Sequence, residues 1–104
     1  MKRTKRRYLA LKLESETIPS ERELMDAVWG AVTKMYGEVG ASQTSLALIR
    51  FDVEKKILVI RTSLVTLPSV RASLATITNV AGKEAAMHVL GVSGTLKSLF
   101  KSCF

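Results

Sequence analysis

The sequence predicts one α+β domain in which four strands and two helices follow one another as βαββαβ. Two apolar runs, residues 46–51 and 57–62, flank a short polar segment, as the strands of a β-hairpin do. A strand-like alternation precedes them, and apolar residues at helical spacing occur both before and after the hairpin. This order is typical of a ferredoxin-like (RRM-like) sandwich, with a four-stranded antiparallel sheet and two helices on one face.

Length and composition fit one folded domain. The chain has 104 residues, of which 47% are apolar, and contains no run of 18 apolar residues that predicts a membrane span. A single cysteine, Cys103, fits a reducing compartment, so we expect a cytoplasmic protein. We divide the chain into a basic N-terminal arm (1–7), the ferredoxin-like domain (8–95) and a short C-terminal amphipathic helix (96–104).

The first strand is predicted at residues 8–14, where leucines alternate with other residues and face the core. Ser20 and Glu23 have the spacing of a capping box, which predicts that a helix starts there. We expect this helix to end at Gly37 and Gly40, since glycine readily adopts the conformation of helix C-termini. Its apolar stripe is interpreted as core and consists of Leu24, Met25, Val28, Trp29, Ala31, Val32, Met35 and Tyr36.

The second half repeats the pattern. Residues 64–79 keep helical spacing, with Pro68 tolerated in the first turn, and residues 79–83 form a turn. Residues 85–90 are the fourth strand, followed by a break at 91–95 and a short terminal helix.

The hairpin predicts a second apolar surface on the sheet. Side chains alternate along a strand, so residues 46, 48 and 50 oppose residues 47, 49 and 51. Neither strand has a plainly polar face, so the face away from the helices needs its own cover: the terminal helix in part, and a protein partner for the rest. The predicted protein interface consists of Leu46, Leu48, Ile57 and Val59, with Ala10 beside them and a rim of Arg50 and Arg61.

The net charge of +7 comes entirely from the two ends of the chain, because residues 8–93 carry nine basic and nine acidic side chains. Basic ends on a neutral domain favour a polyanionic partner, above all nucleic acid; a solvated tail that aids solubility is the alternative. The candidate RNA-binding residues are Lys2, Arg3, Lys5, Arg6, Arg7, Lys97 and Lys101.

No catalytic constellation is recognisable. His88 is the single histidine and has no neighbouring carboxylate or cysteine in sequence to form a metal set, so we expect a structural or surface residue. Asp52 and Glu54 are interpreted as a solvated pair in the hairpin loop. Residues 93–95 either present backbone N–H groups to an anion or simply cap the last helix. The outward residues of the hairpin are aliphatic or arginine and Tyr8 is the one edge aromatic, so RNA binding would rest on charge and shape and not on base stacking.

Several segments together resemble a known family. The segments are RRYLALKLE, DAVWGAVTKMYGEVGAS, LIRFDVEKKILVIRTS, VRASLATITNV and HVLGVSGTLK, and they resemble archaeal ribonuclease P protein component 2, the Pop-type subunit family shared with eukaryotes. The resemblance implies a non-catalytic subunit of the RNA enzyme that removes 5′ leaders from precursor tRNA. It further implies that the chain binds no cofactor, with magnesium held by the RNA.

The partners implied by the resemblance are ribonuclease P RNA and a barrel-type protein subunit. A homodimer within a heterotetramer is left open. The alternative function is a ferredoxin-like ligand-binding or regulatory domain that oligomerises through its sheet, although such a domain has no evident use for a basic arm.

Overall fold

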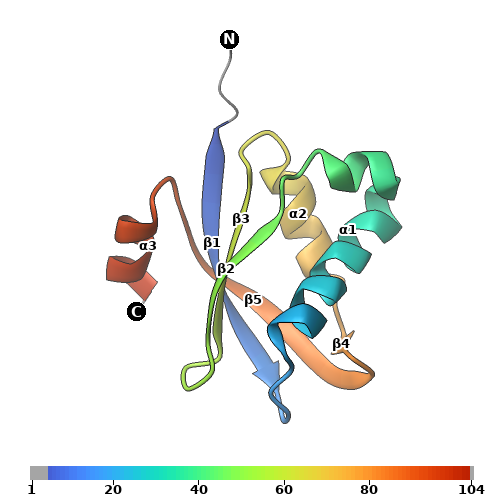
Figure 1. Ribbon diagram of the computed structural model, residues 1–104, viewed down its shortest axis with the longest axis vertical. Helices are drawn as coiled ribbons and strands as arrows, with labels where there is room; N and C mark the ends of the chain where they lie inside the picture. Colours follow the sequence, from blue (N-terminus) through green and yellow to red (C-terminus); the bar gives the residue numbers. More distant parts are fainter. Residues whose placement is uncertain (1–4, 104) are drawn as a thin grey trace.

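The computed structural model describes residues 5–103, except the side chain of Cys103 (Figure 1). The elements are β1 (Arg6–Ser15), α1 (Glu21–Ser42), β2 (Ala47–Asp52), β3 (Ile57–Ser63), α2 (Leu67–Leu74), β4 (Asn79–Val80), β5 (Lys83–Ser93) and α3 (Leu96–Cys103). The strands form one antiparallel sheet in the order β2-β3-β1-β5-β4. Helices α1 and α2 cover one face, and α3 lies on the other (Figure 1).

The α+β class is confirmed, but the prediction of four strands is wrong by one. Residues 79–83 do turn, with positive φ at Ala81 (53°) and Gly82 (79°). Two consecutive residues with positive φ are typical of a type I′ hairpin turn, whose twist lets the flanking residues pair. Val80 therefore pairs with Lys83 and Asn79 with Glu84, which adds the two-residue strand β4.

The central strand β1 is buried on both faces. Leu9, Leu11 and Leu13 point into the core beneath the helices, as predicted, while Ala10 is buried on the opposite face. β1 begins at Arg6, two residues earlier than the expected strand, and Arg6 and Arg7 pair with Ser63 and Thr62 of β3. These two arginines of the predicted arm are therefore held in the sheet.

The start of α1 is as predicted. The Ser20 N–H donates to Glu23 Oε1 at 2.9 Å, and the Glu23 N–H donates to Ser20 Oγ at 3.2 Å. The predicted end is wrong, because Gly37 (φ 76°, ψ 174°) bends the chain and the helix then resumes as far as Ser42. Gly37 therefore acts as a kink.

The interpretation of the whole α1 stripe as core is also wrong. Leu24, Val28 and Val32 are buried, but Trp29, Met35 and Tyr36 are 42%, 45% and 42% exposed. The stripe is wider than the surface that α2 and the sheet cover, so its flanks remain in solvent. Similarly, α2 ends at Leu74, and Ile77 reaches the core from the segment that follows it.

The hairpin corrects the predicted faces of β2. Leu48 pairs with Ile60 and Arg50 with Val59, so Ile49 is an extra residue and forms a β-bulge. Leu46, Leu48 and Phe51 therefore pack against the helix-side core, while Ile49 turns to the α3 side. The prediction that Leu46 and Leu48 belong to the second face is wrong, because strict alternation fails at a bulge.

The second face is covered by α3. Leu99 is 1% exposed and packs with Ala10, Ile57 and Val59, and the edge of this cluster is formed by Tyr8, Ile49, Leu96 and Phe100. Val59 is fully buried there, so the apolar surface predicted from the hairpin is largely internal in this structure.

We expect Leu99→Ala to lower the free energy of unfolding by about 2–5 kcal/mol, because it removes a buried side chain and leaves a cavity. Urea denaturation measures the change, and Ser102→Ala on the exposed side of the same helix is the matched control. Equal stability of the two variants would show that α3 does not remain packed on the sheet.

Gly37→Ala should destabilise the protein by about 1–3 kcal/mol, because φ 76° with ψ 174° is a conformation that is essentially restricted to glycine. Gly30→Ala in the same helix is the matched control: no atom lies within 4 Å of the added Cβ. It should stabilise by about 0.5–1 kcal/mol through helix propensity. Thermal unfolding of both variants checks the kink, and an equal gain at the two positions would contradict it.

Candidate RNA and protein interfaces

Basic side chains gather at the end of the sheet where β1 begins. Lys5 and Arg6 are exposed and Arg7 is half-buried; Lys2 and Arg3 lie outside the described residues. Tyr8 pairs with both Arg61 of β3 and Ser93 of β5, so this end also contains Arg61 and the start of the connection to α3. In the described part of the chain, no carboxylate forms an ion pair with any of these cations.

The connection to α3 passes close to Arg7. A Cβ added to Gly94 would lie 3.4 Å from Nη1 of Arg7, so glycine leaves room for the guanidinium group against the backbone. Thr95 then caps α3, because its Oγ1 accepts from the Ser98 N–H at 3.3 Å. Of the two roles weighed for residues 93–95, the capping role is the one that these contacts display.

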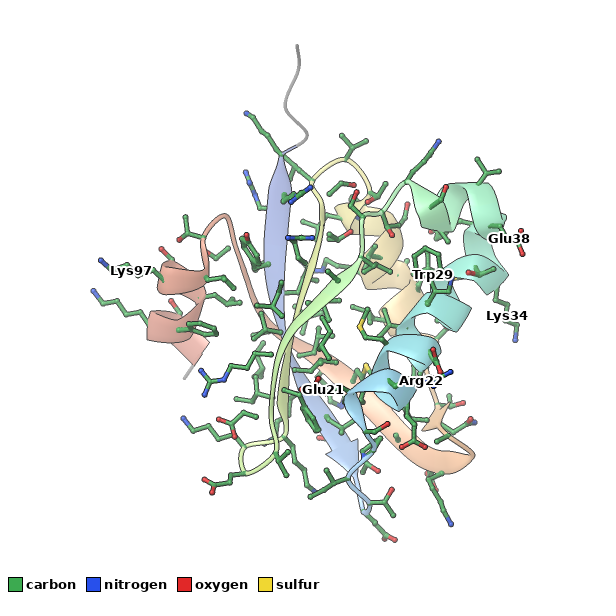
Figure 2. The ribbon with its side chains drawn as sticks, in the orientation of Figure 1. Glu21, Arg22, Trp29, Lys34, Glu38 and Lys97 are labelled. Carbon is green, nitrogen blue, oxygen red and sulfur yellow. The ribbon has the colours of Figure 1, made fainter. Side chains whose placement is uncertain are left out.

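The two cations of α3 lie on its outer side. Lys97 and Lys101 are exposed, and Figure 2 shows Lys97 pointing away from the sheet. The inner side of the helix is occupied by Leu96, Leu99 and Phe100. The tertiary structure thus brings the beginning of α3 to the same end of the sheet as Arg6 and Arg7, while the RNA-binding role of these cations stays a prediction.

The apolar residues of the predicted protein interface fall into two environments. Leu46 and Leu48 pack against the helix-side core, and Ile57 and Val59 lie beneath α3. Contact between a partner and Ile57 or Val59 would require α3 to move, so this role stays a prediction. The exposed large apolar residues lie elsewhere, four of them on α1 (Trp29, Met35, Tyr36 and Val39) and the others at Ile18, Val53, Val65 and Leu90.

The two rim arginines differ in their contacts. Arg50 lies 3.8 Å from a carboxylate oxygen of Asp52, and its guanidinium carbon is 5.5 Å from the centre of the Phe100 ring. Arg61 is half-buried, and its buried Nε has no hydrogen-bond partner among residues 5–103. Both arginines lie on the α3 side of the sheet, and what the sequence did not indicate is that Asp52 and Phe100 lie close to Arg50.

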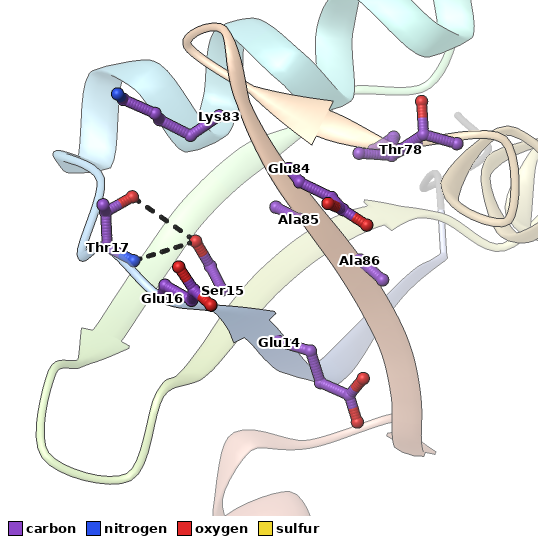
Figure 3. Close-up of a pocket in the computed structure, with 10 residues that line it drawn as sticks. Glu14, Ser15, Glu16, Thr17, Thr78, Lys83, Glu84, Ala85 and Ala86 are labelled. Atoms are coloured by element: carbon purple, nitrogen blue, oxygen red, sulfur yellow. Dashed lines mark hydrogen bonds between the residues drawn. The ribbon is translucent and has the colours of Figure 1, made fainter.

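A cleft with an acidic lining lies at the opposite end of the sheet. It has a volume of about 550 Å³, lies between the end of β1 and the start of β5, and is lined by three carboxylates, those of Glu14, Glu16 and Glu84 (Figure 3). Lys83 is the cation of its lining, and the Ser15 hydroxyl accepts a hydrogen bond from the Thr17 N–H at 3.3 Å. The carboxylates make this cleft an unfavourable place for a phosphate.

Of the residues expected to lack chemistry, His88 and Glu54 are exposed, whereas Asp52 is partly buried and accepts a hydrogen bond from the Lys55 N–H. His88 Nε2 lies 3.3 Å from Glu14 Oε2, and both side chains are more than half exposed, so the pair contributes little to stability. Within residues 5–103, no group of three or more His, Cys, Asp or Glu side chains is arranged to hold a metal ion. None of the described helices is long and apolar enough to cross a membrane.

Comparison with known proteins agrees with this architecture. A chain of the cryo-EM structure of yeast ribonuclease MRP superimposes with a TM-score of 0.73, covering 92% of this chain and 79% of that chain. The sequences are 15% identical, so this likeness concerns the fold alone.

Relatives at the sequence level are ribonuclease P protein component 2 proteins. The one from Methanosarcina barkeri is 38% identical over 95 residues, which cover 91% of this chain and 69% of the relative. The Methanosarcina mazei protein is 39% identical, with coverage of 91% and 80%, and the Pyrococcus furiosus protein is 36% identical, with coverage of 93% and 81%. The model of the Rpp14/Pop5 family matches residues 7–104. Because the match extends over nearly the whole chain, from the basic start of β1 to the end of α3, this chain belongs to the Rpp14/Pop5 family.

Proposed function

We propose that this chain is a non-catalytic protein subunit of ribonuclease P that supports RNA-catalysed removal of the 5′ leader from precursor tRNA. Family membership and the names of the relatives support this function. The observation that carries it is the basic end of the sheet, where Lys5, Arg6, Arg7 and Arg61 form no ion pair with described carboxylates. Such a surface suits the phosphate backbone of RNA.

The fold is consistent with this role. The four longer strands lie in the order β2-β3-β1-β5 with α1 and α2 on one face, which supports a ferredoxin-like topology with β4 as an addition. In our proposal the chain acts in the cytoplasm with ribonuclease P RNA and a barrel-type protein subunit. It binds no cofactor, and the catalytic magnesium belongs to the RNA.

The alternative, a ligand-binding domain that oligomerises through its sheet, has weaker support. The face that such oligomers would use is covered by α3, and its central residues Ala10 and Val59 are fully buried. The acidic cleft is open to solvent and has no feature beyond its carboxylates that identifies a ligand.

The purified chain alone should not cleave precursor tRNA, with or without magnesium, because no nucleophile–base pair or metal set is assembled in the described residues. Added to ribonuclease P RNA and the other protein subunits, it should increase the cleavage rate. Gel analysis of 5′-labelled precursor tRNA measures both effects. Cleavage by the chain alone that disappears in Asp52→Asn or Glu54→Gln would contradict the proposal.

Deleting residues 1–5 should weaken RNA binding without unfolding the domain, because β1 begins at Arg6. The slope of log K against log salt should fall by roughly 0.7–0.9 for each phosphate that the shortened chain no longer neutralises. Binding titrations at several salt concentrations measure this slope. Lys83→Gln, in the acidic cleft, is the control and should leave it unchanged; an unchanged slope in the deletion variant would identify the arm as a solvated tail.

A further inference from the structure

Arg61 occupies a defined place on the α3 face of the sheet. It continues the β3 row that begins with Ile57 and Val59, and it lies directly opposite Tyr8 of β1 and Ala47 of β2. Ile57 and Val59 are buried in the cluster beneath α3, and Tyr8 packs at the edge of that cluster. Arg61 therefore lies between the part of this face that α3 covers and the basic end of the sheet.

The side chain of Arg61 forms no hydrogen bond or ion pair with another residue in the range 5–103, and its Nε is buried. A buried guanidinium N–H without an acceptor is unfavourable, and such groups are uncommon in folded proteins. Among the described residues, none supplies an acceptor or an anion to this guanidinium group, and the side chain as a whole is only partly buried.

Arg50 provides an internal comparison. It belongs to the neighbouring strand β2, pairs with Val59, and lies against α3 through its contact with Phe100. Unlike Arg61, it has a carboxylate nearby, that of Asp52 at 3.8 Å. Arg50 and Arg61 therefore lie on adjacent strands near α3, but the described residues supply a carboxylate to Arg50 and none to Arg61.

The surroundings of Arg61 favour a polyanion. Arg6 and Tyr8 share one face of β1 because side chains alternate, so Arg6 lies on the same face as Arg61. Lys5 precedes it, and Arg7 lies beside Gly94 at the same end. A single carboxylate from a protein partner would leave most of these cations unpaired, whereas consecutive phosphates of an RNA strand match several of them.

We propose that Arg61 is a fixed phosphate-binding residue of this subunit, binding the RNA backbone together with Arg6; this inference rests on the proposed function. Its partly buried stem is already ordered in the folded protein, so binding costs little further conformational entropy. The planar guanidinium group donates two parallel hydrogen bonds to one phosphate. The contact is with the backbone, so it positions the RNA and does not read its sequence.

The decisive variant is Arg61→Met, which keeps the apolar stem and removes the charge. The probes are an in vitro transcript of Methanosarcina mazei ribonuclease P RNA and an unrelated duplex RNA, titrated against the full-length chain at several salt concentrations. We expect roughly tenfold weaker binding and a salt slope smaller by roughly 0.7–0.9. The melting temperature should be equal or higher, because an unpaired buried donor is removed. Arg50→Met is the matched control and should retain affinity and slope.

Unchanged RNA affinity in Arg61→Met would overturn the inference. If its melting temperature were also lower, Arg61 would be a structural residue. If its binding to a protein subunit were weaker instead, Arg61 would be a protein-binding residue. If Arg61→Met fails to fold, or becomes both less stable and weaker in binding, Arg61→Lys decides. Lysine keeps the positive charge but lacks the planar group that donates two parallel hydrogen bonds. The affinity for RNA should therefore fall several-fold while the salt dependence of binding stays unchanged. Full RNA affinity in Arg61→Lys would refute the proposal. The proposed function fails separately, if the unaltered chain binds ribonuclease P RNA no better than the duplex.

Discussion

The fold depends on the burial of β1 from both sides. Its leucines form the centre of the core beneath α1 and α2, while Ala10 contacts the cluster that α3 closes on the other face. The strand also pairs with β3 along one edge and with β5 along the other. β1 thus contacts the helix layer on one face, α3 on the other, and a neighbouring strand along each edge. Packing and pairing along the whole strand therefore fix the position of its first residues, the basic Arg6 and Arg7.

Charge is segregated along this same strand. Arg6 and Arg7 begin β1, and Glu14 lies near its end, next to the acidic cleft. β1 therefore begins among basic side chains and ends beside a cleft with an acidic lining. In the proposed function, the basic end of the sheet is the surface that RNA approaches.

The α3 layer turns a sheet face into core and leaves its margin polar. Leu99 covers Ala10, Ile57 and Val59, which removes the apolar surface available to a partner. Arg50 of β2 and Arg61 of β3 lie at the margin of the surface that α3 covers. Arg50 lies near the Asp52 carboxylate and the Phe100 ring, whereas the buried Nε of Arg61 has no hydrogen-bond partner among the described residues. The same helix thus closes the core and contacts Arg50 through Phe100, whereas no described residue supplies an anion to Arg61.

Local patterns were sufficient for every element except β4 and for the location of the basic residues. The alternating leucines of β1, the Ser20–Glu23 capping box and the basic residues before Tyr8 are properties of neighbouring residues, so the sequence alone predicted the order of elements and the cations near the ends. Only the tertiary structure decided the rest. The Ile49 bulge depends on register with β3, and the exposure of Trp29 depends on how much of α1 is covered. The buried, unpaired Nε of Arg61 depends on the pairing of β3 with β1 and β2. These features arise from contacts between residues distant in sequence, which the period of a single strand or helix does not encode.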